Sequence, residues 1–139
     1  MSTGIVIIDH GSRSEQSNAL LHAVVKKFAE RFADRFPIVE PAHMELAAPG
    51  MAQAFARCVV RGADHVIVLP LFLAPGKHMA VDIPRLASEA ATTFPGITMQ
   101  VAAPLGSDDL LVQLLVRRAE QAMDARSQGA RTQTLGVTS

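Results

Sequence analysis

The sequence contains no tryptophan and no tyrosine, and only six phenylalanines, although 49% of its 139 residues are apolar. Its core must therefore be built mainly from aliphatic side chains. There is one cysteine, Cys58, so no disulfide can form within the chain and no cysteine-rich metal or iron–sulfur motif exists. Because Cys58 lies in an apolar stretch with helical periodicity, we interpret it as a buried free thiol and not as a nucleophile.

An excess of charge is also lacking, since 13 basic residues balance 13 acidic ones. This balance gives no sign of attraction to nucleic acid or to a membrane, and we expect neither partner. The longest apolar stretch, Val66–Pro75, is too short to span a bilayer. No basic segment leads into a long apolar region at the amino terminus, as it would in a signal peptide. We therefore expect a cytoplasmic protein.

Apolar runs alternate four times with segments of helical periodicity. The predicted strands are 4–8, 38–46, 65–71 and 97–102, and the predicted helices cover about 12–35, 48–62, 77–94 and 107–126. This order predicts an α/β fold, a four-stranded parallel sheet with helices on both faces. We expect one domain over residues 1–126 and a disordered tail over 127–139, which is rich in Gln, Gly, Thr and Ser.

Three local patterns refine the helices. Ser12 and Glu15 match a capping box, with Ser12 as the N-cap of the first helix. Pro84 is compatible with the third helix only near its first turn. Leu110 begins an apolar face on the last helix, which also includes Leu111, Leu114 and Leu115.

Two histidines follow predicted strands, His10 after the first and His78 after the third. In an open parallel sheet both would lie at the carboxyl edge, where ligands bind. Two neutral imidazoles at one cleft suit a divalent ion such as iron, cobalt or nickel. His10 could equally cap its strand, and a loop histidine such as His78 is usually only solvated. Asp82 is placed to orient the His78 imidazole.

Further polar residues surround these histidines. His43 and Glu45 are two apart in an extended segment, so they are expected to share a face, as a metal-site or acid/base pair or as a simple polar pair. Gly11 would let backbone approach a ligand, and Ser12 would present helix N–H groups to an anion. The candidate anion-binding cations are Arg13, Lys77 and Arg85. We interpret His22 and His65 as ordinary surface histidines.

Four motifs in order resemble the short sirohydrochlorin chelatases, class II chelatases that insert a divalent metal into a tetrapyrrole. They are Asp9-His10-Gly11-Ser12-Arg13, Glu40-Pro41-Ala42-His43-Met44-Glu45-Leu46-Ala47, Phe72-Leu73-Ala74-Pro75-Gly76-Lys77-His78 with Asp82-Ile83-Pro84, and Ala103-Pro104-Leu105-Gly106. The first two look closest to the branch that makes sirohaem, in which the metal is iron. Each motif alone is unspecific, but together they extend the resemblance from about Ile5 to Leu115.

The resemblance implies a chelatase-like half-domain that forms a homodimer, with His10 and His78 as metal-handling and catalytic histidines. On this hypothesis Glu45 assists in removing protons, and Ser12, Arg13, Lys77 and His43 contact the substrate. The metal would be a substrate and no cofactor would be tightly bound. Plant-type relatives carry a cysteine-rich tail for an iron–sulfur cluster, and because residues 127–139 contain no cysteine we expect no cluster.

Other functions stay open at this stage. The metal could be cobalt, for cobalamin synthesis, or less favourably nickel, since imidazole ligands scarcely separate these ions. A non-catalytic tetrapyrrole or metal carrier would need the same histidines. A degraded subunit, kept for its dimer interface, is disfavoured because both histidines are present. Many relatives have a histidine after the Pro-Leu-Gly motif, where this chain has Ser107, so no ligand is assigned there.

Overall fold

Strand and helix alternate four times along the chain, as the apolar periodicity predicts. The computed structural model describes residues 2–74 and 76–127. Its elements are β1 (Thr3–Asp9), α1 (Glu15–Arg31), β2 (Ile38–His43), α2 (Met51–Val60), β3 (His65–Pro70), α3 (Lys77–Thr92), β4 (Thr98–Val101) and α4 (Asp109–Ser127). The tail predicted over 127–139 lies, beyond Ser127, outside the described residues.

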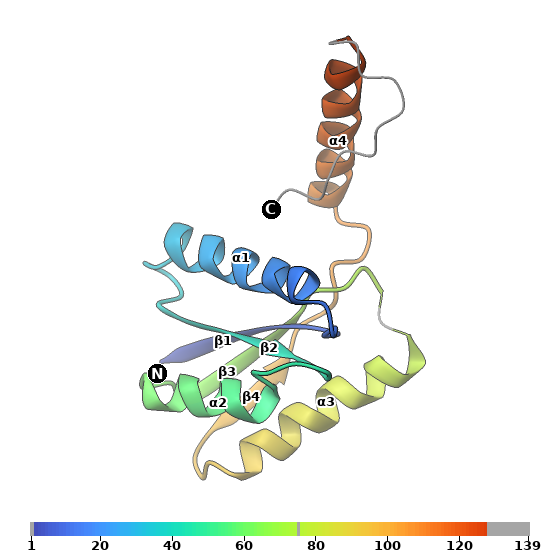
Figure 1. Cartoon of the computed structure of the whole chain (residues 1–139). Helices are drawn as coiled ribbons and strands as arrows, with labels where there is room; N and C mark the ends of the chain where they lie inside the picture. The colour runs from blue at the N-terminus through green and yellow to red at the C-terminus, as the bar shows by residue number, and fades with distance from the viewer. Residues whose placement is uncertain (1, 75, 128–139) are drawn as a thin grey trace.

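The four strands form one parallel sheet in the order β2-β1-β3-β4. Because parallel crossovers are right-handed, the helix that joins β1 to β2 lies on one face, and the helices of the two later crossovers, which run in the opposite direction, lie on the other. Figure 1 shows α1 on one face and α2 and α3 on the other. The predicted fold class is therefore confirmed. The reversal also marks the carboxyl edge between β1 and β3 as the place where this topology binds ligands.

The sheet separates two apolar layers. Alternate side chains of β1 point to opposite faces, so Val6 and Ile8 pack with Phe55 of α2, whereas Ile5 and Ile7 pack with Leu21 of α1. Burial is nearly complete along β1, as expected of a central parallel strand covered on both sides. None of the helices within the described ranges is long and apolar enough to cross a membrane.

Cys58 belongs to the larger of these layers and is fully buried, which confirms its interpretation as a core thiol. Burial, reinforced by the negative charge of Glu40, raises the pKa of the thiol to about 12, although the nearby Arg61 opposes this rise. At neutral pH the group is therefore protonated and a poor nucleophile.

Two helix predictions were wrong in detail. The N-cap of α1 is Ser14, whose hydroxyl accepts the Ser17 N–H at 3.3 Å, because Ser12 is instead bonded to Asn18. Pro84 lies inside α3, beyond its first turn. Pro84 and Ala80 are both exposed, so the Ala80 carbonyl, which lacks an i+4 N–H partner, can be solvated.

The last helix stands apart from the rest of the molecule. After β4 the chain passes through Pro104–Gly106 and enters α4, with the Asp108 carboxylate accepting the Leu110 N–H at 2.9 Å as an N-terminal cap. Figure 1 shows α4 projecting away from the sheet, and it makes none of the main packing contacts between the described elements. Its apolar face is consequently exposed, with Leu110 72% and Leu115 62% accessible.

Candidate active site

An imidazole and a carboxylate meet at the carboxyl edge of the sheet. His10 follows β1 directly and Glu45 lies two residues beyond β2; the two backbones stay paired there, since the Glu45 N–H donates to the His10 carbonyl at 3.1 Å. The side chains then lie together, with His10 Nε2 3.2 Å from Glu45 Oε1. Both are about half exposed, 52% and 51%. They can therefore accept a ligand from solvent.

Gly11 permits this arrangement. Its φ of +88° is one that side-chain-bearing residues rarely adopt. A Cβ built at this position would overlap the Glu45 carbonyl oxygen, only 1.9 Å away. The sequence predicts a close backbone approach at Gly11, but the group that approaches here is the Glu45 backbone. Glycine at this position therefore keeps the segment after β1 against the segment after β2.

His43 and Glu45 do not share a face, contrary to the prediction from their spacing. The strand ends at His43, the chain bends after it, and Leu46 has a φ of +69°. His43 is 1% exposed and its Nδ1 lies 2.7 Å from Asp9 Oδ1 on the neighbouring strand. His43 is thus packed beneath α1, while Glu45 faces solvent beside His10.

His78 is the second residue of α3, exposed in the segment that follows β3. No hydrogen bond or ion pair joins it to His10 in the part of the chain that the structure describes. Asp82 bonds to Arg85 at 3.5 Å and not to His78, so its predicted orienting role is not seen. No group of three or more His, Cys, Asp or Glu side chains within residues 2–74 and 76–127 could hold a metal.

The candidate cations differ in their surroundings. Arg85 is engaged with Glu89 at 3.0 Å and with Asp82, which raises its pKa further and leaves it poorly placed to bind an anion. Arg13 and Lys77 are exposed, and neither forms an ion pair with another described residue. They remain available for carboxylates of a ligand approaching this edge.

Ser12 is not placed as predicted. Its backbone N–H donates to Asn18 Oδ1 at 2.9 Å and its hydroxyl accepts the Ser14 N–H at 3.0 Å. The Asn18 amide also donates to the Ser12 carbonyl, at 2.7 Å. The groups expected to bind an anion therefore hold the loop before α1 in place.

Two neighbours of this site were missed by sequence reasoning. Asp9 pairs with His43, and His22 of α1 lies over His43 with ring centroids 5.5 Å apart. The position of Asp9 beside His10 could have marked Asp9 as a site residue. Its pairing with His43, however, depends on strand register. His22 directly follows the buried Leu21, which gave no indication of a contact with another histidine.

The chain matches the CbiX family over residues 4–122. The chain belongs to this family. It is 48% identical over 120 residues to the chloroplastic sirohydrochlorin ferrochelatase of Arabidopsis thaliana, and 32% identical over 120 residues to the sirohydrochlorin cobaltochelatase of Sulfolobus acidocaldarius. Each alignment covers 86% of this chain, and it covers 52% of the Arabidopsis protein and 92% of the Sulfolobus protein. The resemblance to sirohydrochlorin chelatases is thereby confirmed.

Solved structures agree with this membership. The sirohydrochlorin chelatase SirB of Bacillus subtilis subspecies spizizenii, in complex with cobalt, has a TM-score of 0.79 at 29% identity over 87% of this chain and 51% of SirB. The CbiX protein of Marinobacter aquaeolei has a TM-score of 0.70 at 25% identity, over 88% of this chain and 98% of that protein. The chain thus spans about half the length of some relatives and nearly all of others.

Proposed function

We propose that this chain inserts a divalent metal ion, Fe²⁺ in the first place, into sirohydrochlorin, the last step of sirohaem synthesis. The observation that carries the proposal is the exposed pair of His10 and Glu45 at the carboxyl edge of the sheet. Relatives named for sirohydrochlorin chelation support the choice of substrate.

The chemistry of insertion fits an open pair of ligands. The ion must lose water, the macrocycle must lose two pyrrole N–H protons, and the ion must then leave the protein. An imidazole and a carboxylate bind Fe²⁺ or Co²⁺ without enclosing it, and each can accept a proton once the ion has moved on. We assign metal delivery and proton uptake to His10, with Glu45 as the neighbouring base. A closed cage of protein ligands would instead trap the ion.

Three further exposed residues have roles in the proposed function, namely His78, Arg13 and Lys77. His78 belongs to the segment after β3, and β3 is the strand next to β1, so both histidines belong to the same edge of the sheet. We propose that it shares metal handling with His10. The two exposed cations are suited to the carboxylates of sirohydrochlorin. Because His43 is buried, any contribution it makes is indirect.

Cobalt insertion is the second candidate. The identity of 48% over 120 residues to a ferrochelatase favours iron. It exceeds the 32% over 120 residues to the Sulfolobus cobaltochelatase and the 44% over only 82 residues to the cobaltochelatase of Methanocaldococcus jannaschii. The donor set itself does not decide between them, since imidazole and carboxylate ligands suit both ions and raw affinity does not set the metal used in cells. The metal used must therefore be decided by measurement.

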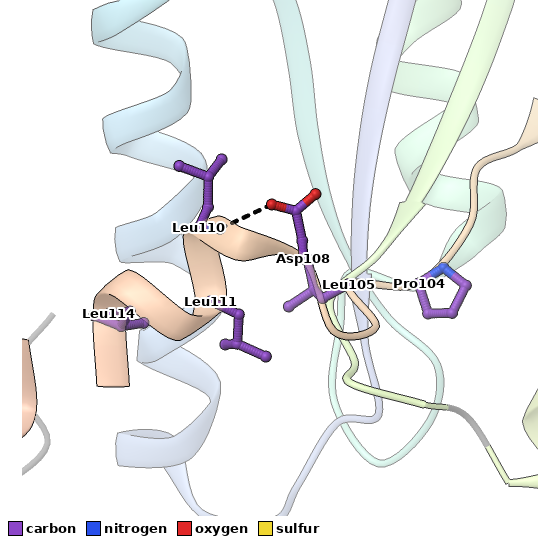
Figure 2. Close-up of a pocket in the computed structure, with 6 residues that line it drawn as sticks. All are labelled: Pro104, Leu105, Asp108, Leu110, Leu111 and Leu114. Carbon is purple, nitrogen blue, oxygen red and sulfur yellow. Dashed lines mark hydrogen bonds between the residues drawn. The ribbon is translucent and has the colours of Figure 1, made fainter. Parts of the chain in front are cut away.

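We further propose that the chain functions as a homodimer in which α4 packs on a second copy. The apolar side chains of α4 are exposed among the residues that the structure describes, and large exposed apolar surfaces mark interfaces. A pocket of about 430 Å³ lies where α4 begins, lined by Pro104, Leu105, Asp108, Leu110, Leu111 and Leu114 (Figure 2). The alignment with SirB covers 51% of that protein, which supports pairing two such units.

The test is anaerobic incubation of the protein with sirohydrochlorin and Fe²⁺, Co²⁺ or Ni²⁺, followed by absorbance against a control without protein. Faster insertion of iron supports the proposal, and faster insertion of cobalt supports the second candidate. Binding of sirohydrochlorin without acceleration by any metal, from folded protein, would instead identify a carrier.

A further inference from the structure

Asp9 and His43 occupy the last registered pair of β1 and β2, immediately before the segments that carry His10 and Glu45. His43 Nδ1 lies 2.7 Å from Asp9 Oδ1, so the imidazole donates its Nδ1–H to the carboxylate. Asp9 is 20% exposed and His43 is 1% exposed. This short, charge-assisted hydrogen bond therefore lies just beneath the exposed site.

A histidine is an unfavourable residue, in terms of stability, for this buried position. Within residues 2–74 and 76–127 His43 is the one buried polar or charged residue, and its Nε2 has no hydrogen-bond partner there. A buried nitrogen without a partner destabilises the fold, and an apolar side chain would avoid that cost. Stability therefore does not explain why this residue is a histidine. A role in holding the segments after β1 and β2 in place would explain it.

The backbone shows what this residue holds in place. The His43 N–H donates to the Pro49 carbonyl at 2.7 Å, which closes the loop containing Glu45. Beyond the pair, the Met44 N–H donates to the Asp9 carbonyl at 2.9 Å, and the next bond joins Glu45 to His10. His43 is thus tied to β1 by its side chain and to the end of its own loop by its main chain.

We infer that Asp9 and His43 are positioning residues, which fix the separation between the His10 imidazole and the Glu45 carboxylate. This inference rests on the proposed function, because it assigns the pair a purpose in metal binding and insertion. The His22 ring packs on His43 and limits its movement on the side of α1. Neither Asp9 nor His43 needs to touch the metal or the tetrapyrrole for this role.

Three substitutions of His43 test the inference. His43→Leu and His43→Phe remove the donor and fill the site with apolar atoms, and Phe also keeps a ring against His22. His43→Asn retains an N–H donor close to the position of Nδ1. We expect both apolar variants to remain folded, with kcat for metal insertion and affinity for Co²⁺ each reduced about tenfold or more. In the His43→Asn variant, kcat and Co²⁺ affinity should both lie within about threefold of the wild-type values.

His65→Leu is the matched control. His65 also bonds to a neighbouring strand, through Thr98 at 2.7 Å and Gln100 at 2.9 Å, but it begins β3, at the opposite end of the sheet. Its replacement should leave kcat and Co²⁺ affinity unchanged. Wild-type kcat and Co²⁺ affinity in either folded apolar variant of His43 would overturn the inference, as would a His43→Asn variant impaired as severely as the apolar ones.

The two readouts separate this inference from the proposed function. Co²⁺ affinity is measured by calorimetry without sirohydrochlorin, so it reports the proposed metal ligands independently of the insertion reaction. Wild-type protein that binds Co²⁺ but inserts no metal would refute the proposed activity. In that case a weaker Co²⁺ affinity in His43→Leu, rescued in His43→Asn, would still support the positioning role.

Discussion

His10 Nε2 lies 3.2 Å from Glu45 Oε1, and both side chains are about half exposed where β1 and β2 end. The contact joins residues 35 positions apart through the register of two parallel strands. Each group carries lone pairs that suit a divalent ion, which is the basis of the metal-binding role proposed for the pair.

Glu45→Gln is predicted to slow metal insertion by roughly a hundredfold, because the amide cannot accept a proton and is a weaker metal ligand. His10→Ala should cause a loss at least as large. The measurement is the initial rate of insertion under anaerobic conditions. Glu15→Gln, at an exposed position in the first turn of α1, is the control and should keep the wild-type rate. Full activity in Glu45→Gln would remove Glu45 from the mechanism.

His78→Ala is predicted to reduce turnover strongly while leaving the melting temperature nearly unchanged. The side chain is exposed at the start of α3, and alanine is a favourable helix residue. Insertion assays and thermal unfolding of the same preparation check both parts. Ser88→Ala, exposed on the same helix, serves as the control. If the His78→Ala variant inserted metal at the wild-type rate, His78 would have no part in metal handling.

The double variant Leu110→Glu/Leu115→Glu is predicted to shift the protein from dimer to monomer, because it places charge on the exposed apolar face of α4. Light scattering after gel filtration measures the mass. Val60→Glu is the control, since Val60 is 87% exposed at the end of α2 and should tolerate the charge. A wild-type protein that is monomeric at all concentrations would contradict the proposed dimer.

Cys58 is predicted to lower the stability of the protein in alkali. Its pKa is raised from 9.0 to about 12 in the folded chain, so between these values the unfolded chain loses the proton and the folded chain keeps it. This contribution to stability is complete below pH 9 and falls as pH rises toward 12. Urea unfolding at several pH values measures it, with Cys58→Ala as the reference. An identical fall in that variant would exclude the thiol as its cause.

Much of the fold could be predicted because it depends on local patterns. The apolar run of β1 and the helical spacing that follows it specify an α/β order without knowledge of any contact. The histidines after β1 and β3 could be assigned to one edge for the same reason. The packing of Cys58 in the core followed from its apolar neighbours.

The predictions from sequence were wrong or incomplete where the local structure depends on a single contact with a residue elsewhere in the chain. Ser12 lost its predicted capping role because the Asn18 side chain binds it, which moved the N-cap to Ser14. The pairing of Asp9 with His43 depends on strand register, which spacing within one segment does not reveal. The apolar face of α4 was predicted correctly from Leu110 onward, but its exposure was not, because periodicity does not say which surface covers it.

The openness of the His10–Glu45 pair has a consequence for metal choice. On the proposed function, an ion held by few protein ligands exchanges freely with its surroundings, and we expect the protein to select only weakly among Fe²⁺, Co²⁺ and Ni²⁺. We therefore expect the metal in the product to follow the supply of free ions, so that a change in cellular metal buffering alters it without any mutation. Competition among metals for one tetrapyrrole, at buffered concentrations, would make this dependence visible.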